Sequence, residues 1–186
     1  MANPWRSSIN RPALGVALVA WWGVTACDRL PAGRRYDVGH GVAVWHRPPE
    51  TGGFLPWQFE VVTPAAHVAR AVVLERGGVG RPVTTVLEAP LPATSGRSPV
   101  TVTFDSGHVV LRVAGAQRVG APETARLRGG LTMNPWDLPQ DASGALVLQY
   151  SFPERLARDP PPTFAEARRI GGSEFLRLRI VPRPTP

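Results

Sequence analysis

The thiol of Cys27 is the strongest candidate for chemistry in this chain, and it is the single cysteine among 186 residues. No second cysteine exists with which it could form a disulfide inside the chain. An unpaired cysteine in an exported protein needs another use, and covalent modification of the thiol supplies one. The residues in front of Cys27 therefore decide how this thiol is interpreted.

The segment before Cys27 has the character of an export signal. Residues 1–11 carry two arginines and no acid, and residues 13–26 follow without a charge. Such a run suits the hydrophobic region of a signal peptide and is shorter than the roughly 20 residues that a membrane-spanning helix needs. The charge of Asp28 ends the run. An uncleaved membrane anchor and a buried, unreactive cysteine are the alternatives.

Residues 24–27 resemble the lipobox of bacterial lipoproteins, in which small residues precede an acylated cysteine. Val24 matches the apolar position, Thr25 and Ala26 match the small positions, and Cys27 matches the cysteine. The resemblance implies cleavage before Cys27, with acyl chains such as palmitate on its sulfur and on the new amino terminus. Asp28 resembles the residue that retains enterobacterial lipoproteins in the inner membrane. The resemblance covers only the start of the chain, and the remainder resembles no family.

These features predict how the chain is divided. We expect a signal peptide at residues 1–26, a lipidated Cys27 with a short polar tether at 27–35, one domain at 36–182 and a disordered tail at 183–186. A chain of this length can bury enough surface for a stable core without disulfides.

The basic residues are all arginines, 21 of them against 14 acids, which gives a net charge of +7. Net charge bears on solubility and non-specific attraction rather than on fold. No nucleic-acid recognition motif accompanies the charge, so we expect no nucleic-acid partner.

Alternating apolar and polar residues, separated by turn residues, predict an all-β fold. The clearest hairpin joins residues 100–104 to 109–113 through Asp105-Ser106-Gly107. The other predicted strands are 42–46, 57–61, 72–75, 83–87, 125–131, 145–152 and 174–181. This many short strands favours a single β-sandwich, immunoglobulin-like or related.

One short helix is expected near residues 164–170. Thr163 and Glu166 have the spacing of a capping box, and Gly171 follows where a helix should end. Residues 65–76 are ambiguous between helix and strand, and Val72-Val73 favours strand for their second half.

Few other residues are placed for catalysis or metal binding. The four histidines lack the spacing of a metal site, so we expect neither a metal nor a cofactor. No Gly-x-Ser-x-Gly motif is present. Asp105-Ser106-Gly107-His108 contains residue types used in catalysis, but we interpret it as a hairpin turn rather than as a catalytic group. The sequence thus gives an enzyme little support.

Aromatic and arginine side chains are the candidates for binding. We expect Trp45 and Trp57 to lie in the core, whereas Trp136 follows Asn134-Pro135 in a loop, where it could contact a partner or a sugar. Arg177 and Arg179 share one face of the final strand, with Arg183 beyond them. This face could protect a sheet edge or contact an acidic partner or lipid headgroups, and we favour edge protection.

The sequence as a whole indicates a membrane-anchored envelope lipoprotein facing the periplasm or exterior, at the inner membrane if Asp28 acts in sorting. The favoured role is a non-catalytic binding or accessory subunit of an envelope assembly. A solute- or glycan-binding lipoprotein and a membrane-tethered hydrolase are the alternatives, and the oligomeric state is left open.

Overall fold

The computed structural model describes residues 33–47, 56–64, 68–92, 96–121, 127, 130–133, 137–156 and 160–183. All of them belong to one unit, Pro31–Pro186. The lipobox-like residues 24–27, Asp28 and Trp136 lie outside the described residues. Among the described residues, no helix is long and apolar enough to cross a membrane.

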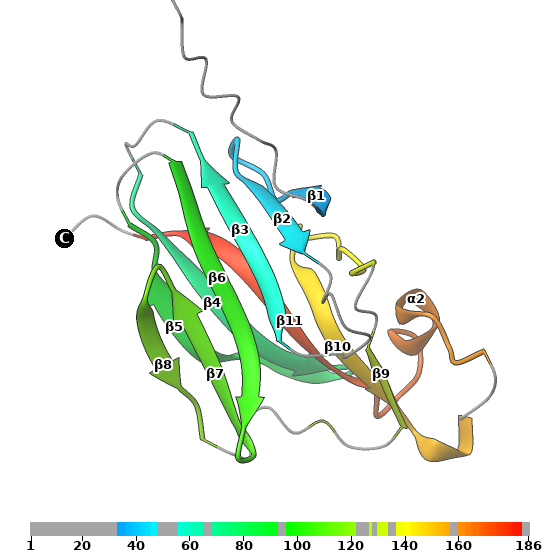
Figure 1. Ribbon diagram of the computed structural model, residues 1–186. Helices are drawn as coiled ribbons and strands as arrows, with labels where there is room; N and C mark the ends of the chain where they lie inside the picture. Colours follow the sequence, from blue (N-terminus) through cyan, green and yellow to red (C-terminus); the bar gives the residue numbers. More distant parts are fainter. Residues whose placement is uncertain are drawn as a thin grey trace, which may run out of the picture. The chain divides into compact units, whose positions relative to one another are not determined.

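The described strands form two antiparallel sheets that stack face to face (Figure 1). The six-stranded sheet has the order β1-β2-β3-β6-β7-β8, and the five-stranded sheet has the order β5-β4-β11-β10-β9. This arrangement confirms the predicted all-β sandwich. The strands of the six-stranded sheet are β1 (Arg34–Asp37), β2 (Ala43–Arg47), β3 (Trp57–Thr63), β6 (Gly96–Asp105), β7 (His108–Val113) and β8 (Ala116–Val119). Those of the five-stranded sheet are β4 (Arg70–Gly78), β5 (Arg81–Pro90), β9 (Gly130–Met133), β10 (Leu146–Phe152) and β11 (Glu174–Pro182).

The main hydrophobic core lies between the two sheets. Alternate residues of the inner strands point into it because successive side chains in a strand face opposite sides. Trp57, Phe59 and Val61 enter it from β3, and Leu176 and Leu178 enter it from β11. Tyr36 enters the core from β1, and its hydroxyl oxygen accepts a hydrogen bond of 2.9 Å from the Leu138 amide.

A second, smaller core covers the opposite face of the five-stranded sheet. It consists of Val147, Tyr150, Phe152, Phe164 and Ala167, with Leu156 and Phe175 packed against it. The helix α2 (Phe164–Ala167) supplies Phe164 and Ala167, and a 3₁₀ turn, η1 (Glu154–Leu156), precedes it. The predicted capping box is present, with both reciprocal hydrogen bonds between Thr163 and Glu166. The predicted helix is thus confirmed at its start, but it ends at Ala167, before the predicted end near residue 170, and it packs on this second core.

The predicted Asp105–His108 turn is confirmed as a two-residue hairpin loop. Ser106 and Gly107 have φ angles of 49° and 83°, the left-handed conformation that tight hairpins require. A second hairpin of the same kind, through Ala114 and Gly115, leads into β8. Every residue of β8 is exposed, so its sequence has no hydrophobic alternation from which it could have been predicted.

Several predicted boundaries differ from the structure. The sheet begins at Arg34, inside the predicted tether, and the only buried residue of β1 is Tyr36. The ambiguous segment is strand from Arg70 onward, whereas residues 65–67 lie outside the described residues. The strand predicted at 125–131 appears as β9, Gly130–Met133. Arg183 is held to the domain, because its amide donates a 2.7 Å hydrogen bond to the carbonyl of Ala69.

The edge-protection interpretation of the final strand is wrong. β11 lies between β4 and β10 in the middle of its sheet, and all nine of its residues pair with β4. Its arginine face therefore belongs to a central strand and protects no edge.

Candidate functional site

Arg177 and Arg179 form ion pairs within the domain. The Nε of Arg177 lies 2.7 Å from a carboxylate oxygen of Glu75, and its Nη1 pairs with Asp141. Arg179 approaches the other oxygen of Glu75 at 3.0 Å. The side chain of Arg177 is only 12% exposed. These contacts give Arg177 a structural role, and a contact of this pair with a partner remains a prediction.

Asp141 is held as a carboxylate in this network. Burial alone would raise the pKa of Asp141, but hydrogen bonds from Ser143 and the charge of Arg177 outweigh it and lower the pKa below its ordinary value. Asp141 also accepts the amide hydrogen of Ala145 at 3.2 Å, which ties the loop before β10 to the sheet. Arg177 and Arg179 are thus both paired with carboxylates of the domain, and Arg177 is largely covered.

The two tryptophans expected in the core lie on opposite sides of the six-stranded sheet. Trp57 is 1% exposed and lies in the core, as predicted. Its ring packs edge-to-face on that of Phe104. Trp45 is half-buried on the outward face, so its placement in the core is wrong. Val44 and His46 point inward instead, because Ala43 and Trp45 occupy the alternate phase of β2. Because inward and outward positions alternate along β2, the inward placement of Val44 and His46 puts Trp45 on the solvent side.

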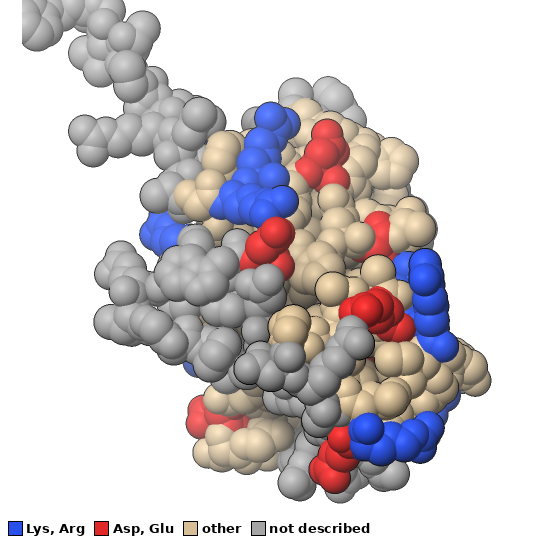
Figure 2. Space-filling view, turned by 90° about the vertical axis from the view of Figure 1, so that its right-hand side faces the viewer, with Lys and Arg blue, Asp and Glu red and all other residues tan. Residues whose placement is uncertain are grey.

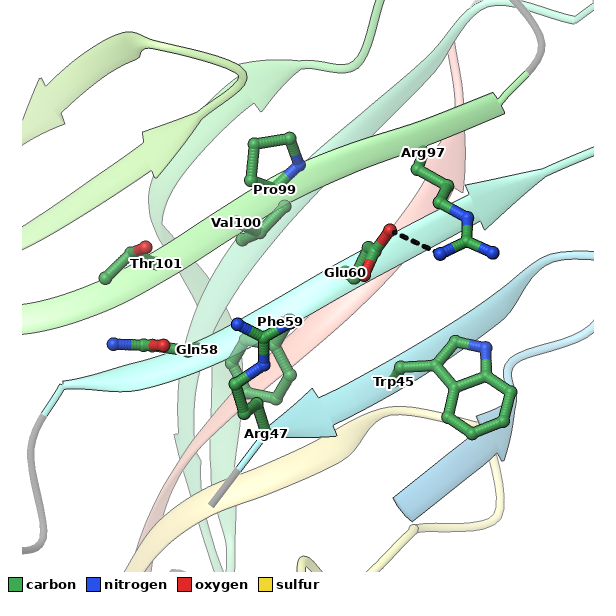
Figure 3. Close-up of a pocket in the computed structure, with 9 residues that line it drawn as sticks. All are labelled: Trp45, Arg47, Gln58, Phe59, Glu60, Arg97, Pro99, Val100 and Thr101. Carbon is green, nitrogen blue, oxygen red and sulfur yellow. Dashed lines mark hydrogen bonds and ion pairs between the residues drawn. The ribbon is translucent and has the colours of Figure 1, made fainter. Parts of the chain in front are cut away.

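Trp45 borders a groove of about 350 Å³ on this outward face. Three adjacent strands form the groove: β2, β3 and β6. Trp45, Glu60 and Pro99 lie in register across them, and Arg47, Gln58 and Thr101 form the next row. The remaining lining residues are Phe59, Arg97 and Val100. Trp45 and Arg97 lie toward one end of the groove, and Gln58 and Thr101 lie toward the other (Figure 3).

The hollow shape follows from the sizes of the side chains. Pro99 and Thr101 are short, whereas Trp45, Arg47 and Arg97 are long, so the surface dips over β6. Proline is unusual in an inner strand because it cannot donate to the ladder. Pro99 is tolerated because β7 ends opposite Val100, and the Pro99 carbonyl still accepts the Ala114 amide at 2.9 Å.

The charged groups of the groove leave an excess of positive charge. Arg97 donates to Glu60 at 3.4 Å, across one diagonal of the strand pairs (Figure 3). Among the described lining residues there is one carboxylate, Glu60, against two arginines. Within the described part of the chain, Arg47 has no ion pair, and it is exposed. Among the described residues, the groove therefore offers one arginine without an ion pair, Arg47, in the same lining as the Trp45 ring.

The side of the molecule on which α2 lies contrasts with this lining. There, basic and acidic side chains are interspersed in small patches, and neither sign dominates (Figure 2).

Neither Arg177 nor Arg179 lines this groove, and the other predicted site residues lie outside the described part of the chain. Sequence reasoning missed Arg47, Gln58, Glu60, Arg97 and Thr101, because their grouping depends on the register of three strands. One signal was present: the alternation at 57–61 placed Gln58 and Glu60 on the polar face of that strand. The pairing of β3 with β2 and β6 places Arg47 and Thr101 beside these polar residues and so completes the groove.

The groups considered for catalysis do not come together in the described structure. The Ser106 hydroxyl donates to Asp105 at 3.1 Å, whereas His108 Nδ1 lies 2.9 Å from the Gly120 carbonyl oxygen. The described residues contain no group of three or more histidine, cysteine, aspartate or glutamate side chains that could hold a metal ion.

His46 is fully buried, and neither of its ring nitrogens has a hydrogen-bond partner among the described residues. Its ring packs 5.2 Å from that of Phe59, beneath the groove. Burial lowers the pKa of His46 to about 4. The ring is therefore neutral at physiological pH, and it behaves as part of the core.

Comparison with known proteins leaves the groove as the main guide to function. No protein-family model matches this chain, and no match is found among curated proteins or solved structures.

Proposed function

We propose that this chain is a lipid-anchored protein of the bacterial cell envelope whose β-sandwich is a non-catalytic binding module. The groove on the outward face of the six-stranded sheet is its binding surface. The observation that carries this proposal is the outward-facing Trp45 in a hollow lined by Arg47, Gln58 and the Glu60–Arg97 pair. Concave sites with an aromatic surface and a few convergent polar groups are typical of ligand binding.

The anchor in this proposal rests on the sequence. The lipobox-like residues 24–27 follow an apolar run of signal-peptide length, and Cys27 would carry the lipid. Several acyl chains together would hold the protein far more firmly than a single chain, which gives only marginal binding. The residues from Asp28 to Gly33 then span at most about 20 Å before β1 begins. Such a tether restricts the module to ligands and partners near the bilayer, as expected of an accessory subunit.

The nature of the groove favours binding over hydrolysis. A hydrolytic site needs a nucleophile next to a base or a pair of carboxylates. The lining offers one carboxylate, engaged by Arg97, and the hydroxyl of Thr101. What these groups do well is hold a ligand through hydrogen bonds, charge and an aromatic face.

The anchor is tested by mass spectrometry of the mature protein isolated from its own membranes. An N-terminal Cys27 carrying acyl chains is expected, and Cys27→Ala should move the protein into the soluble fraction. A retained Met1, or an unmodified Cys27, would contradict the anchor.

The binding role is tested by photo-crosslinking in intact cells. A photoreactive aromatic amino acid replaces Trp45 in one strain and Thr85 in another, because Thr85 is exposed on the other sheet. Light-dependent adducts are expected from position 45 and not from position 85. Absence of an adduct at 45, or equal adducts at both positions, would contradict the groove as the binding surface.

A further inference from the structure

We infer that the groove recognises an oligosaccharide that carries carboxylate groups. This inference rests on the proposed function and assigns the chemical class of ligand to the same groove. It combines three properties of the lining: an aromatic face, hydrogen-bonding side chains in register, and an arginine that has no ion pair with another described residue.

The aromatic face belongs to Trp45. Among the described residues that line the groove it is the only tryptophan, and it is half-buried on the outward face. The flat indole can pack against the carbon-bound hydrogens of a sugar ring, and its polar N–H tolerates the wet rim. Trp45 sits on a strand rather than a loop, so the orientation of its ring is set by the sheet.

The hydrogen-bonding groups suit a ligand with many hydroxyls. Glu60 can only accept hydrogen bonds, whereas Gln58 and Thr101 can both donate and accept. Gln58 and Thr101 face each other across β3 and β6, where neighbouring strands lie about 4.8 Å apart. A saccharide presents donors and acceptors at similarly short intervals. The central carboxylate of Glu60 favours hydroxyls, because it would repel a phosphate placed there.

The cation sets the acidic character of the ligand. Arg47 lies opposite Gln58 at one corner of the groove and makes no ion pair within the described part of the chain. Its guanidinium can bind a carboxylate through two parallel hydrogen bonds. Arg35, exposed and in register with Trp45, extends the positive charge toward β1. An acidic sugar therefore meets Arg47 or Arg35 without disturbing the Glu60–Arg97 pair.

An extended acidic peptide fits this groove less well. Peptides usually bind sheets by adding a strand to an edge, where backbone groups are unpaired. β3 forms the centre of the groove and pairs with β2 on one side and β6 on the other. The backbone N–H and C=O groups of a bound peptide could form hydrogen bonds only with side chains of the groove. Side chains are sufficient for the hydroxyls of a saccharide.

The experiment measures binding affinities by isothermal titration calorimetry, with the full lipidated chain in neutral-lipid nanodiscs. The probes are a tetramer of galacturonic acid, its fully methyl-esterified counterpart, tetraglutamate and inorganic phosphate. We expect the acidic tetramer to bind and the neutral ester to bind about tenfold more weakly, because one charge-assisted hydrogen-bond pair is lost. Tetraglutamate and phosphate should bind more weakly still.

Three variants identify the groups responsible. Arg47→Ala should weaken binding of the acidic tetramer about tenfold and leave the neutral ester unchanged. Trp45→Ala should abolish binding of both saccharides. Arg118→Ala is the matched control, since Arg118 is exposed on the same sheet but does not line the groove. Thermal unfolding of each variant checks that it is folded.

The outcomes separate the two proposals. If no saccharide binds while position 45 still forms crosslinks in cells, the saccharide assignment is wrong and the binding function stands. If position 45 also forms no crosslink, both proposals fail. Equal or tighter binding of tetraglutamate or phosphate, or equal losses in Arg47→Ala and Arg118→Ala, would overturn the acidic saccharide as the ligand.

Discussion

The outward faces of the two sheets use similar residues in opposite ways. On the five-stranded sheet, Arg177 lies over the ring of Phe175 and pairs with Glu75 and Asp141. On the six-stranded sheet, Arg47 and Trp45 occupy the same kind of strand positions, but Arg47 has no ion pair within the described part of the chain.

This difference separates structure from function. A buried charge must be paired because its desolvation is expensive, so the covered arginines stabilise the fold. An exposed arginine beside an aromatic ring adds little stability and is available for a ligand. Four predictions follow in order of decreasing effect, and the first two test this division directly.

The largest effect is expected for the tryptophan on the inner side of the groove. Trp57→Ala should lower the free energy of unfolding by about 3–5 kcal/mol, because it removes a fully buried side chain. Trp45→Ala, on the outer side of the same sheet, should lower it by about 1 kcal/mol or less. Denaturant unfolding of both variants measures the difference, and equal losses would contradict the opposite placement of the two rings.

The ion-pair network supplies the next prediction. Arg177→Met should destabilise the domain by about 3 kcal/mol, since it leaves the buried carboxylates of Glu75 and Asp141 without their main cation. Arg47→Met, the matched change on the open face, should alter the free energy of unfolding by about 0.5 kcal/mol or less. A loss in Arg177→Met as small as that in Arg47→Met would show that the two faces do not differ in this way.

The buried histidine makes stability depend on pH. The pKa of His46 is about 4 in the folded protein and about 6.5 when unfolded, so the unfolded chain binds the extra proton between these values. Stability should therefore fall as the pH decreases from 6.5 toward 4, by about 2 kcal/mol at pH 5. Unfolding at pH 7.5 and pH 5 measures the loss.

His46→Leu is the control, because it should abolish most of the loss between these two pH values. Asp141 contributes only at lower pH, since its pKa lies below its ordinary value and its stabilisation is lost as the pH falls through that range. A wild-type stability that is flat between pH 7.5 and 5 would contradict the account of His46.

The smallest effect concerns the helix that covers the five-stranded sheet. Thr163→Ala should reduce stability by about 1 kcal/mol, because the hydroxyl of Thr163 caps the Glu166 amide. Thr163→Ser keeps that hydroxyl and should restore most of the loss. Chemical denaturation of the pair tests the cap, and equal stabilities of the alanine and serine variants would argue against it.

Local sequence signals predicted the elements with strong chemistry of their own. The Asp105-Ser106-Gly107 turn and the Thr163–Glu166 capping box are both confirmed, because turns and caps depend on a few adjacent residues. β1 and β8 could not be predicted, since they bury one residue and none, respectively. Elements that contribute little to the core leave no hydrophobic period in the sequence.

The groove could not be predicted because it depends on phase and register together. In β2, Val44 with His46 and Ala43 with Trp45 are two possible inward sets, and the apolar tryptophan favoured the wrong one. The structure buries Val44 and His46 instead, so Trp45 and Arg47 lie on the outward face. The Arg177–Asp141 pair was equally invisible, since it joins residues from distant parts of the chain.

The central claim, that Trp45 lies in an open binding site, is tested most directly by hydroxyl-radical footprinting. The oxidation rate of Trp45 is measured in the purified protein and in intact cells, with buried Trp57 as the internal reference. We predict that Trp45 is oxidised readily in the purified protein and is protected in cells, while Trp57 is protected in both. Equal oxidation of Trp45 in the two settings would contradict an occupied groove.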